Sequence, residues 1–419
     1  MTRKKERGSV TEATVAVSHP AQPARKRHGV RGAISVVLTC ALLGILVGCG
    51  SSSAASSSSG GSATGAAASS SKVETRTVTD TSGRTVEIPV HPQNIASLQP
   101  FAATLLIMGG AGDILCGAPG ATSTNQILQQ LYPPLATDVL QTSGNTVDVE
   151  ALLSRSCDLV IVKNTLPDSE RAKLDRVGIP YLDIEFNTID EQIAAMRLIG
   201  DIVGDTAQEN IEGLATYFEN TLAEVAARTA SIPDDQRVSI YHSNNDILVT
   251  DSTDSLGSDW IAAAGCINVA FGQAPADNPD FTTSLEQVYN WNPDIIICNS
   301  AATANSVLAD SKWASLDAVA NGRVYVLPIG ASRWGHFGEV ETYLGVLWLS
   351  CLAYPDLFGD IDFKQRVVDY YHDYLGIEVT DDLYAMIVSG EDIRTEGSGS
   401  GSGTGGGGGT GGGGHCTGC

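Results

Sequence analysis

The spacing of apolar residues divides the middle of the chain into short strands and helices that alternate. Residues 77–90 (TVTDTSGRTVEIPV) alternate apolar with polar side chains around Ser82-Gly83, a pattern that predicts a β-hairpin. The segment FAATLLIMGG is typical of a helix and follows the short apolar run NIASL. Strands that alternate with helices favour an α/β fold with a parallel sheet. The short apolar runs predicted as strands lie at residues 94–98, 238–243 and 322–328.

A weak internal repeat relates the two halves of this region. Residues 148–164 read DVEALLSRSCDLVIVKN, and residues 284–300 read SLEQVYNWNPDIIICNS. In each unit a short amphipathic helix begins near a glutamate, Glu150 or Glu286. An aspartate follows the helix, and a four-residue apolar run follows the aspartate. Such a run is typical of a strand buried on both faces of a parallel sheet. One unit in each half predicts two α/β lobes of related build.

A long helical stretch separates the two halves. From Thr188 to about Thr229, apolar residues recur at i, i+3, i+4 and i+7, with one expected break near Gly204-Asp205. A long helix between two lobes provides a stiff connection. The domain boundaries that follow are 75–187 for an N-terminal α/β lobe, 188–230 for the linking helix and 231–395 for a C-terminal α/β lobe.

The N-terminal segment has the order of an export signal. Four basic residues within 25–31 precede the apolar run 33–47, which is shorter than the roughly 20 residues that a transmembrane helix needs. Residues 46–49 (LVGC) resemble the lipobox of bacterial lipoproteins, where the signal is cut before a cysteine that becomes lipidated. We therefore expect residues 1–48 to be a lipoprotein signal peptide and Cys49 to be the lipidation site. The alternative is a signal anchor in which Cys49 is only a small apolar residue.

Low-complexity segments flank the predicted lobes. Residues 49–74 are rich in Ser, Gly and Ala and indicate a flexible tether. Residues 396–419 form a Gly-rich tail that ends in HCTGC, where His415, Cys416 and Cys419 offer a metal-binding, disulfide-forming or reactive group. Two cysteines and one histidine are fewer than the four ligands of a structural zinc site.

Charge and cysteine usage narrow the class of function. The chain carries 25 Lys and Arg against 48 Asp and Glu, a net charge of −23, which disfavours nucleic acid and anionic lipid surfaces as partners. The internal cysteines contain no paired CxxC motif, and buried thiols are the default expectation. One disulfide is possible in an exported protein, but its pairing is not set by the sequence. The five internal cysteines are Cys116, Cys157, Cys266, Cys298 and Cys351.

Several motifs in a fixed order carry a family resemblance over about residues 75–390. They are DTSGRTVEIP at 80–89, PQNIASL at 92–98, the two repeated units, AAGCINVA at 263–270, WASLDAVANGRVY at 313–325 and ETYLGVLWLSCLAYPDLF at 341–358. Together they resemble the substrate-binding proteins of ABC importers for iron–siderophore, haem and cobalamin complexes. The resemblance implies an α/β fold of two Rossmann-like lobes, bridged by a long rigid helix, with a ligand cleft between them.

The resemblance also implies a function and partners. By this resemblance, the chain is expected to be a monomeric, lipid-anchored receptor on the outer face of the cytoplasmic membrane. The receptor would capture a ferric siderophore or another metal chelate and deliver it to an ABC permease. Glu150 and Glu286 carry over as the residues that dock onto the permease dimer; the alternative is that they only favour helix N-termini. A molybdate- or tungstate-type oxyanion receptor and a non-transport sensory lipoprotein remain alternative functions. No intrinsic cofactor is implied.

Loops after the predicted strands supply the candidate ligand-binding residues, because ligands of open α/β sheets lie beyond the carboxyl ends of the strands. In IGASRWGHFGEVE, Arg333 can bind an oxyanion, Trp334 can pack on a planar ligand and His336 can offer a nitrogen. The alternatives are an ion pair of Arg333 with Glu339 or Glu341, burial of Trp334 and a hydrogen-bonded loop His336. The other strand-end candidates are Phe101, Asn164, Tyr241, His242 and Asn299.

Catalytic and metal-binding motifs are missing from the sequence. Residues 330–334 (GASRW) lack the second glycine of a nucleophile elbow, and no HExxH, P-loop or GxGxxG motif occurs. We therefore expect no enzymatic activity. A dedicated zinc or manganese site needs three or four clustered ligands, whereas the histidines of the predicted lobes are scattered at His91, His242, His336 and His372.

Overall fold

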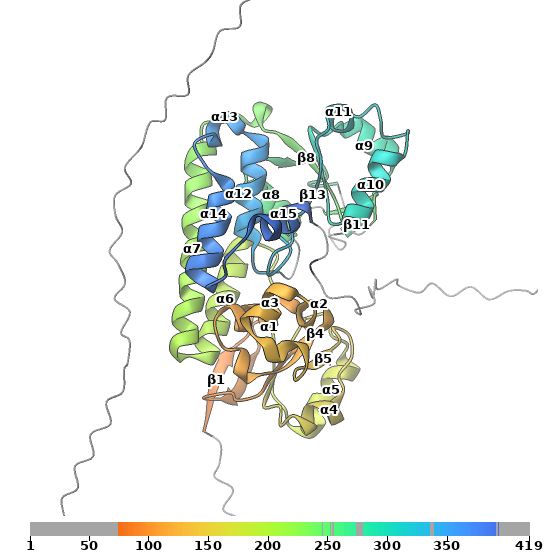
Figure 1. The fold of residues 1–419 in the computed structure, drawn as a ribbon. Coiled ribbons are helices and arrows are strands. Elements are labelled where there is room, and N and C mark those ends of the chain that lie inside the picture. Colours follow the sequence, from red (N-terminus) through yellow and green to blue (C-terminus); the bar gives the residue numbers. More distant parts are fainter. Residues whose placement is uncertain are drawn as a thin grey trace, which may run out of the picture. The chain divides into compact units, whose positions relative to one another are not determined.

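The computed structural model describes residues 74–244, 246–251, 253, 255–273, 280–335, 339–390 and 393 (Figure 1). The signal peptide, residues 49–73 of the tether including Cys49, His336 and residues 394–419, which include the tail that ends in HCTGC, lie outside the described residues. No helix in the described ranges is both long and apolar enough to cross a membrane.

The chain enters the N-terminal lobe through the predicted hairpin. Strands β1 (Thr75–Thr79) and β2 (Thr85–Pro89) pair antiparallel, with Val78 opposite Val86. The Asp80 carboxylate closes the turn, because it accepts hydrogen bonds from the backbone N–H groups of Ser82 (3.1 Å) and Arg84 (2.9 Å). This side-chain acceptor holds the tight reversal that the Ser-Gly pair predicted.

A five-stranded parallel sheet, in the order β5-β4-β3-β6-β7, forms the N-terminal lobe. Leu159 and Ile161 of β6 belong to one apolar cluster, whereas Val160 and Val162 belong to another, so both faces of the sheet are covered. The strands are β3 (Ile95–Ser97), β4 (Leu115–Pro119), β5 (Leu140–Thr142), β6 (Leu159–Val162) and β7 (Tyr181–Asp183). The helices are α1 (Pro100–Met108), α2 (Gly120–Ser123), α3 (Gln126–Leu131), α4 (Val149–Ser154) and α5 (Asp168–Val177), with 3-10 turns at Gly112–Ile114 and Pro133–Ala136.

The lobe is followed by two helices, α6 (Ile189–Val203) and α7 (Asp205–Thr229), where the sequence had predicted one linking helix. The break occurs at Gly204, as expected, but the chain reverses there, since Arg197 on α6 bonds to both Glu212 and Glu219 on α7. Helix α7 runs along both lobes (Figure 1). At one end Asn210 donates to the carbonyl of Gly109, and at the other end Arg228 binds Asp360.

The C-terminal lobe contains a mixed sheet of six strands. Strands β8, β10, β12 and β13 pair parallel, and β9 pairs antiparallel with both β8 and β11. The strands are β8 (Ser239–Ser243), β9 (Val249–Asp251), β10 (Ile267–Asn268), β11 (Asp280–Thr282), β12 (Ile295–Cys298) and β13 (Val324–Val326). The helices are α8 (Leu256–Ala263), α9 (Leu285–Trp291), α10 (Ala301–Ala309), α11 (Asp317–Ala320), α12 (Thr342–Ala353), α13 (Pro355–Phe358), α14 (Phe363–Tyr370) and α15 (Asp381–Ser389), with a 3-10 turn at Asp234–Gln236 and a π-helical turn at Tyr371–Leu375.

The repeated units occupy equivalent places in the two sheets. Strand β6 pairs with β3, and β12 pairs with β8, in each case parallel and next to the first strand of the lobe. The aspartate before each strand binds the start of that neighbour. Asp158 accepts from the N–H of Asn94 (3.0 Å), and Asp294 accepts from the N–H of Ser239 (2.8 Å). The sequence repeat therefore reflects one helix–strand unit used twice.

Candidate ligand-binding site

A cavity of about 280 Å³, counting the space open to solvent, lies between the two lobes. Its N-terminal wall consists of the first turns of α1 and the segment from α2 to the start of α3. Its C-terminal wall is the loop after β13. The lining residues are Pro100, Thr104, Ala121, Thr122, Asn125, Ile329, Ala331, Ser332, Arg333 and Glu339.

Asn125 joins the two walls of the cavity. Its side-chain oxygen caps α3 by accepting from the N–H groups of Ile127 (3.0 Å) and Leu128 (3.1 Å). Its Nδ2 atom donates across to the carbonyls of Gly330 (2.9 Å) and Ala331 (3.3 Å) in the C-terminal lobe. Because one amide supplies both contacts, the start of α3 is tied to the opposite wall.

Thr122, on the same wall, is buried and lines the cavity. Its hydroxyl has no hydrogen-bond partner within the described part of the chain. A buried hydroxyl without a partner is unfavourable, so a polar group that enters the cavity gains a donor there. Thr104, one turn into α1, lines the cavity as well and is also buried.

Buried groups below the cavity hold the loop that carries Arg333. The Glu341 carboxylate accepts from the N–H of Ser332 (2.8 Å), and the Ser332 hydroxyl accepts from the N–H of Glu341 (3.0 Å). The Tyr371 hydroxyl accepts from the N–H of Ala331 (3.0 Å). Gly330 is required at this point, because a Cβ atom there would lie 1.8 Å from the Tyr371 hydroxyl. Burial raises the pKa of Glu341 from 4.5 to about 7.

The lining offers mainly hydrogen-bond donors. Arg333 supplies a guanidinium group, which suits carboxylates and oxyanions, and Thr104, Thr122 and Ser332 are hydroxyl residues. Helix α1 directs its N-terminal turn to the cavity and has no acidic residue in that turn, which favours a negative charge. Glu339 is the acidic member of the lining and opposes the charge of Arg333. Within the described ranges, no three His, Cys, Asp or Glu side chains gather to hold a metal ion.

The structure places the predicted ligand residues in different surroundings. Arg333 lines the cavity. Trp334 is fully buried and packs edge-on against Phe363 with 5.9 Å between ring centroids, so burial, the alternative for this residue, holds in this conformation. Phe101 is equally buried and packs against Phe186 at 4.6 Å. Asn164 is exposed, and its carbonyl accepts from Arg171.

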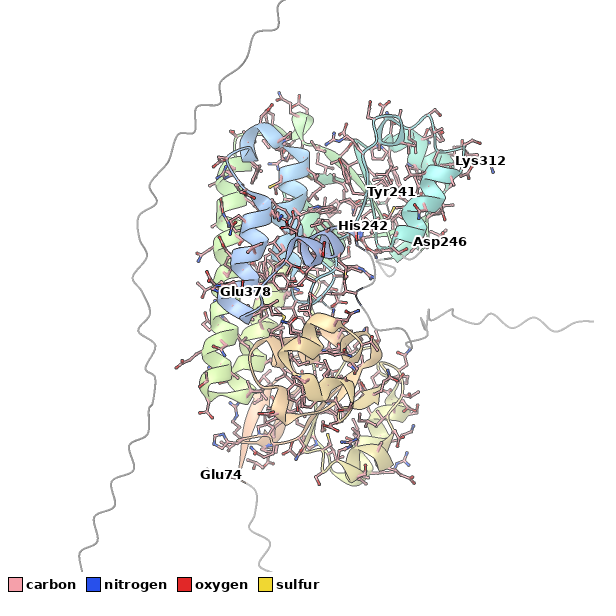
Figure 2. All side chains as sticks on the ribbon, in the orientation of Figure 1. Glu74, Tyr241, His242, Asp246, Lys312 and Glu378 are labelled. Carbon is pink, nitrogen blue, oxygen red and sulfur yellow. The ribbon has the colours of Figure 1, made fainter. Side chains whose placement is uncertain are left out.

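Tyr241 and His242 lie inside the C-terminal lobe (Figure 2). The Tyr241 ring packs near Trp291 and Trp313, and its hydroxyl donates to the carbonyl of Ile247 (2.9 Å). Burial raises the pKa of Tyr241 well above its usual range. Tyr241 therefore serves the core in this conformation and does not line the cavity.

His242 and Asn299 belong to a buried ring of four side chains. His242 Nδ1 contacts the Asp251 carboxylate, and His242 Nε2 lies 2.8 Å from Asn299 Oδ1. Asn299 donates to Asn244 Oδ1 (3.1 Å), and Asn244 in turn donates to Asp251 Oδ1 (2.6 Å). The ring joins β8, β9 and the residue after β12. Its hydrogen bonds are made within the lobe, away from the residues that line the cavity.

The sequence reasoning overlooked most of the cavity wall. Thr122 and Asn125 lie in GATSTN, directly after β4, and Pro100 and Thr104 follow β3. The strand-end rule that selected Phe101 also applies to these positions. The composition of GATSTN, rich in hydroxyl and amide side chains after an apolar run, was the available signal.

Glu150 and Glu286 occupy matching positions on the two lobes. Each lies exposed in the first turn of its helix, α4 or α9. The helices are capped by Asp148, which accepts from the N–H of Ala151 (3.0 Å), and by Ser284, which accepts from the N–H of Gln287 (3.1 Å). Since the capping groups are other residues, both carboxylates point to solvent without a structural task in the cap.

Two α/β lobes, a bridging helix and a polar cavity between the lobes define a solute-binding protein of the ABC importer class. The periplasmic binding protein family matches residues 95–329, more than half of the chain, and the chain belongs to this family. Its relatives include proteins named for binding molybdate, vitamin B12 and an iron(3+) hydroxamate. The chain is therefore an extracytoplasmic binding protein.

Three relatives illustrate the range of ligands in the family. The chain is 26% identical over 326 residues to the molybdate-binding protein MolA of Haemophilus influenzae, which covers 73% of this chain and 92% of the relative. It is 25% identical over 252 residues to a vitamin B12-binding protein of Vibrio cholerae (57% and 82% covered). It is 24% identical over 276 residues to the iron(3+)-hydroxamate-binding protein FhuD of Bacillus subtilis (61% and 80%).

The fold agrees with a solved structure of the same class. The structure of MolA with bound molybdate superposes with a TM-score of 0.64, covers 73% of this chain and 99% of that chain, and is 24% identical in sequence. This likeness establishes the two-lobed fold, which the sequence motifs had implied.

Proposed function

We propose that this chain captures a small tetrahedral oxyanion of the molybdate type in the cavity between its lobes and delivers it to an ABC permease. The observation that carries the proposal is a small cavity whose lining combines the Arg333 guanidinium with the Thr122 hydroxyl, which has no hydrogen-bond partner among the described residues.

The similarity to MolA supports the same ligand class, since MolA is named for molybdate and covers most of the chain. Donors that converge from both lobes suit a compact anion, because hydroxyl, amide and guanidinium groups all donate to oxygen. The N-terminal end of α1 adds a favourable partial charge.

A metal chelate such as a ferric siderophore, haem or cobalamin is the second candidate. The relatives named for vitamin B12 and for an iron(3+) hydroxamate favour it. A chelate of that size requires the lobes to separate, which means breaking the hydrogen bonds from Asn125 to Gly330 and Ala331. This cost favours the oxyanion over the chelate.

Delivery requires a permease and an anchor. We assign permease docking to Glu150 and Glu286, because both are exposed and occupy equivalent positions on the two lobes. Lipidation at Cys49 followed by the Ser- and Gly-rich tether would hold the receptor at the outer face of the membrane.

Calorimetric titration of the purified protein tests the ligand class. Molybdate, tungstate, sulfate, a ferric hydroxamate siderophore, haem and cobalamin are titrated into the wild type, Arg333→Ala and the exposed control Arg176→Ala. Saturable binding of molybdate or tungstate that Arg333→Ala weakens by at least tenfold, with Arg176→Ala unchanged, supports the proposal. Binding of a chelate alone would replace it with the second candidate.

A further inference from the structure

Glu341 is a fully buried acidic residue behind the C-terminal wall of the cavity. Its Oε2 atom accepts a hydrogen bond from the N–H of Ser332 (2.8 Å) and lies 3.5 Å from the Ser332 hydroxyl oxygen. Ser332 lines the cavity next to Arg333. One residue therefore separates the Glu341 carboxylate from the space that a ligand would occupy.

The surroundings of the Glu341 carboxylate favour the neutral acid over the ion. Its Oε1 atom is buried without a hydrogen-bond partner in the described part of the chain, and its Oε2 atom contacts the neutral Ser332. A buried carboxylate ion is unfavourable unless a cation or several donors compensate for its lost hydration. In agreement with this geometry, burial raises the pKa of Glu341 to about 7. The carboxyl group can therefore gain or lose a proton near neutral pH.

Among the described residues, the ionisable groups around Glu341 are tyrosines and the charged residues of its own loop. They are Tyr343 of α12, Tyr370 of α14, Tyr371 of the π-helical turn, Arg333 and Glu339. Burial raises the pKa of each tyrosine well above its usual range, so these hydroxyls are neutral at physiological pH. The like charge of Glu339 adds to the effect of burial on the pKa of Glu341. A negatively charged ligand in the cavity would add to the repulsion from Glu339 and offset the charge of Arg333, and both effects favour a protonated Glu341.

We propose that Glu341 is a positioning residue of the binding site that takes up a proton when an anion enters the cavity. This role rests on the proposed function, because it requires an anion beside Ser332 and Arg333. The Glu341 carboxyl holds the loop through the N–H of Ser332, and its charge determines how strongly the wall repels the anion. Glu341 is not among the residues that line the cavity, so it acts on the ligand through Ser332 and Arg333.

Proton uptake couples the affinity for the anion to pH. The proton comes from water or buffer and adds to a carboxylate oxygen of Glu341, and no bond of the ligand is broken. Binding of the anion favours protonation, and protonation favours binding to the same extent. Below a pH of about 7 the carboxyl group of the ligand-free protein is already protonated, so the affinity does not change with pH. Above this pH the proton must be taken up on binding, so the affinity falls as the pH rises.

Neutral substitutions separate the charge of Glu341 from the shape of its side chain and from the charge of Glu339. Glu341→Gln keeps the side-chain length and a carbonyl oxygen that can accept from the N–H of Ser332, but it is neutral at every pH. Glu339→Gln removes the like charge that lines the cavity in the same loop. Glu341→Met, which is also neutral and similar in length, replaces the glutamine variant if urea unfolding shows that Glu341→Gln does not fold.

Calorimetric titration with molybdate from about pH 6 to 9 tests this role of Glu341. The affinity of the wild type is expected to fall about tenfold between about pH 7 and 9, because the anion then meets an ionised carboxylate. Titrations in buffers of different ionisation enthalpy count the protons, and about half a proton per molybdate is expected near pH 7.5. Glu341→Gln should bind with one affinity at every pH and take up no proton, whereas Glu339→Gln should retain the proton uptake.

Failure of this role can be told apart from failure of the proposed function. Binding of molybdate by the wild type without proton uptake overturns the role of Glu341 and leaves the proposed ligand intact. Proton uptake that persists in Glu341→Gln overturns it as well, and its loss in Glu339→Gln would then assign the proton to Glu339. If molybdate binds at no pH, the proposed function fails, and the role of Glu341 fails with it.

Discussion

At the scale of single residues, a substitution that removes the Thr122 hydroxyl tests the proposed binding site. Thr122→Val keeps the shape of the side chain and removes a buried hydroxyl that has no partner within the described chain. We expect the affinity for molybdate to fall about tenfold, since a hydrogen bond to a charged group is worth roughly 1.5–3 kcal/mol. Stability in urea should stay equal or rise, because the wild-type hydroxyl is buried without compensation.

The exposed Thr137→Val is the control for this substitution, and it should change neither quantity. Equal affinities of wild type and Thr122→Val would remove the hydroxyl from the site. A loss of stability together with affinity would mean that Thr122 supports the wall and does not bind the ligand.

The raised pKa of Glu341 predicts that the free energy of unfolding depends on pH. Burial raises its folded-state pKa from 4.5 to about 7, so between these values the folded protein holds a proton that the unfolded chain has lost. The free energy of unfolding should therefore fall as pH rises from about 4.5 to 7, by at most about 3 kcal/mol from this group, and change no further above that.

Urea unfolding of wild type and Glu341→Gln at intervals from pH 4.5 to 8 measures this contribution. The glutamine is neutral throughout, so the difference between the two proteins should vary in that window, while contributions common to both cancel. A difference that is constant with pH would show that Glu341 is ionised in the folded state throughout the window.

At the scale of single residues, the sequence singled out Arg333, which lines the cavity, but not the other lining residues. The chemical type of a side chain is visible in the sequence, and a guanidinium in a glycine-rich loop is conspicuous. Whether Trp334 or Tyr241 can face a ligand depends on which of their surfaces the fold buries. Both rings pack against aromatic residues that are far away in the sequence, Phe363 and Trp291 respectively. Thr122 is distinguished only by the burial of its hydroxyl in the cavity wall, which depends on the fold.

At the scale of secondary-structure elements, Asn125 has two roles, because it caps helix α3 and also binds the other lobe. Asn125→Ser retains a capping oxygen and loses the amide that reaches Gly330 and Ala331, whereas Asn125→Ala loses both functions. We expect Asn125→Ala to be less stable than Asn125→Ser by about 1 kcal/mol in urea unfolding, the usual worth of a cap.

The effect of the hydrogen bonds from Asn125 to the other lobe should be measurable separately, as a change in ligand affinity. Both variants lose the same interlobe hydrogen bonds and should therefore show the same change in molybdate affinity. Different affinities for the two variants would mean that the helix cap, and not the bridge, shapes the cavity.

Helices and strands were largely predictable from local patterns. The repeated Glu…Asp units became α4–β6 and α9–β12, and the hairpin formed where Ser82-Gly83 predicted it. The reversal at Gly204 was not predictable in the same way. A glycine break is visible in the sequence, but the direction after it depends on contacts such as those from Arg197 to Glu212 and Glu219.

Docking onto the permease is a prediction for the whole molecule. Glu150→Lys combined with Glu286→Lys reverses the charge at two exposed, equivalent positions, one on each lobe. Uptake of the ligand in cells should be lost, while calorimetric affinity of the purified receptor for molybdate stays within twofold of the wild type. Charge reversal at a rim changes association most strongly at low salt.

A double variant with the same change in net charge is the control. Glu209→Lys with Asp235→Lys alters two exposed acids outside the repeated units and should leave uptake intact. If this control abolishes uptake as well, the total charge and not the two helix tips governs delivery. If neither double variant affects uptake, docking uses other residues.

The sequence by itself determined the class of fold, the two related lobes, the presence of a helical bridge and the acidic surface. These properties depend on composition and on periodicity within one element, and the family motifs follow the chain in order. Only the tertiary structure decided which residues share the cavity and that α6 folds back on α7. Such contacts join residues far apart in the sequence, and their formation depends on how whole elements pack, which no local pattern encodes.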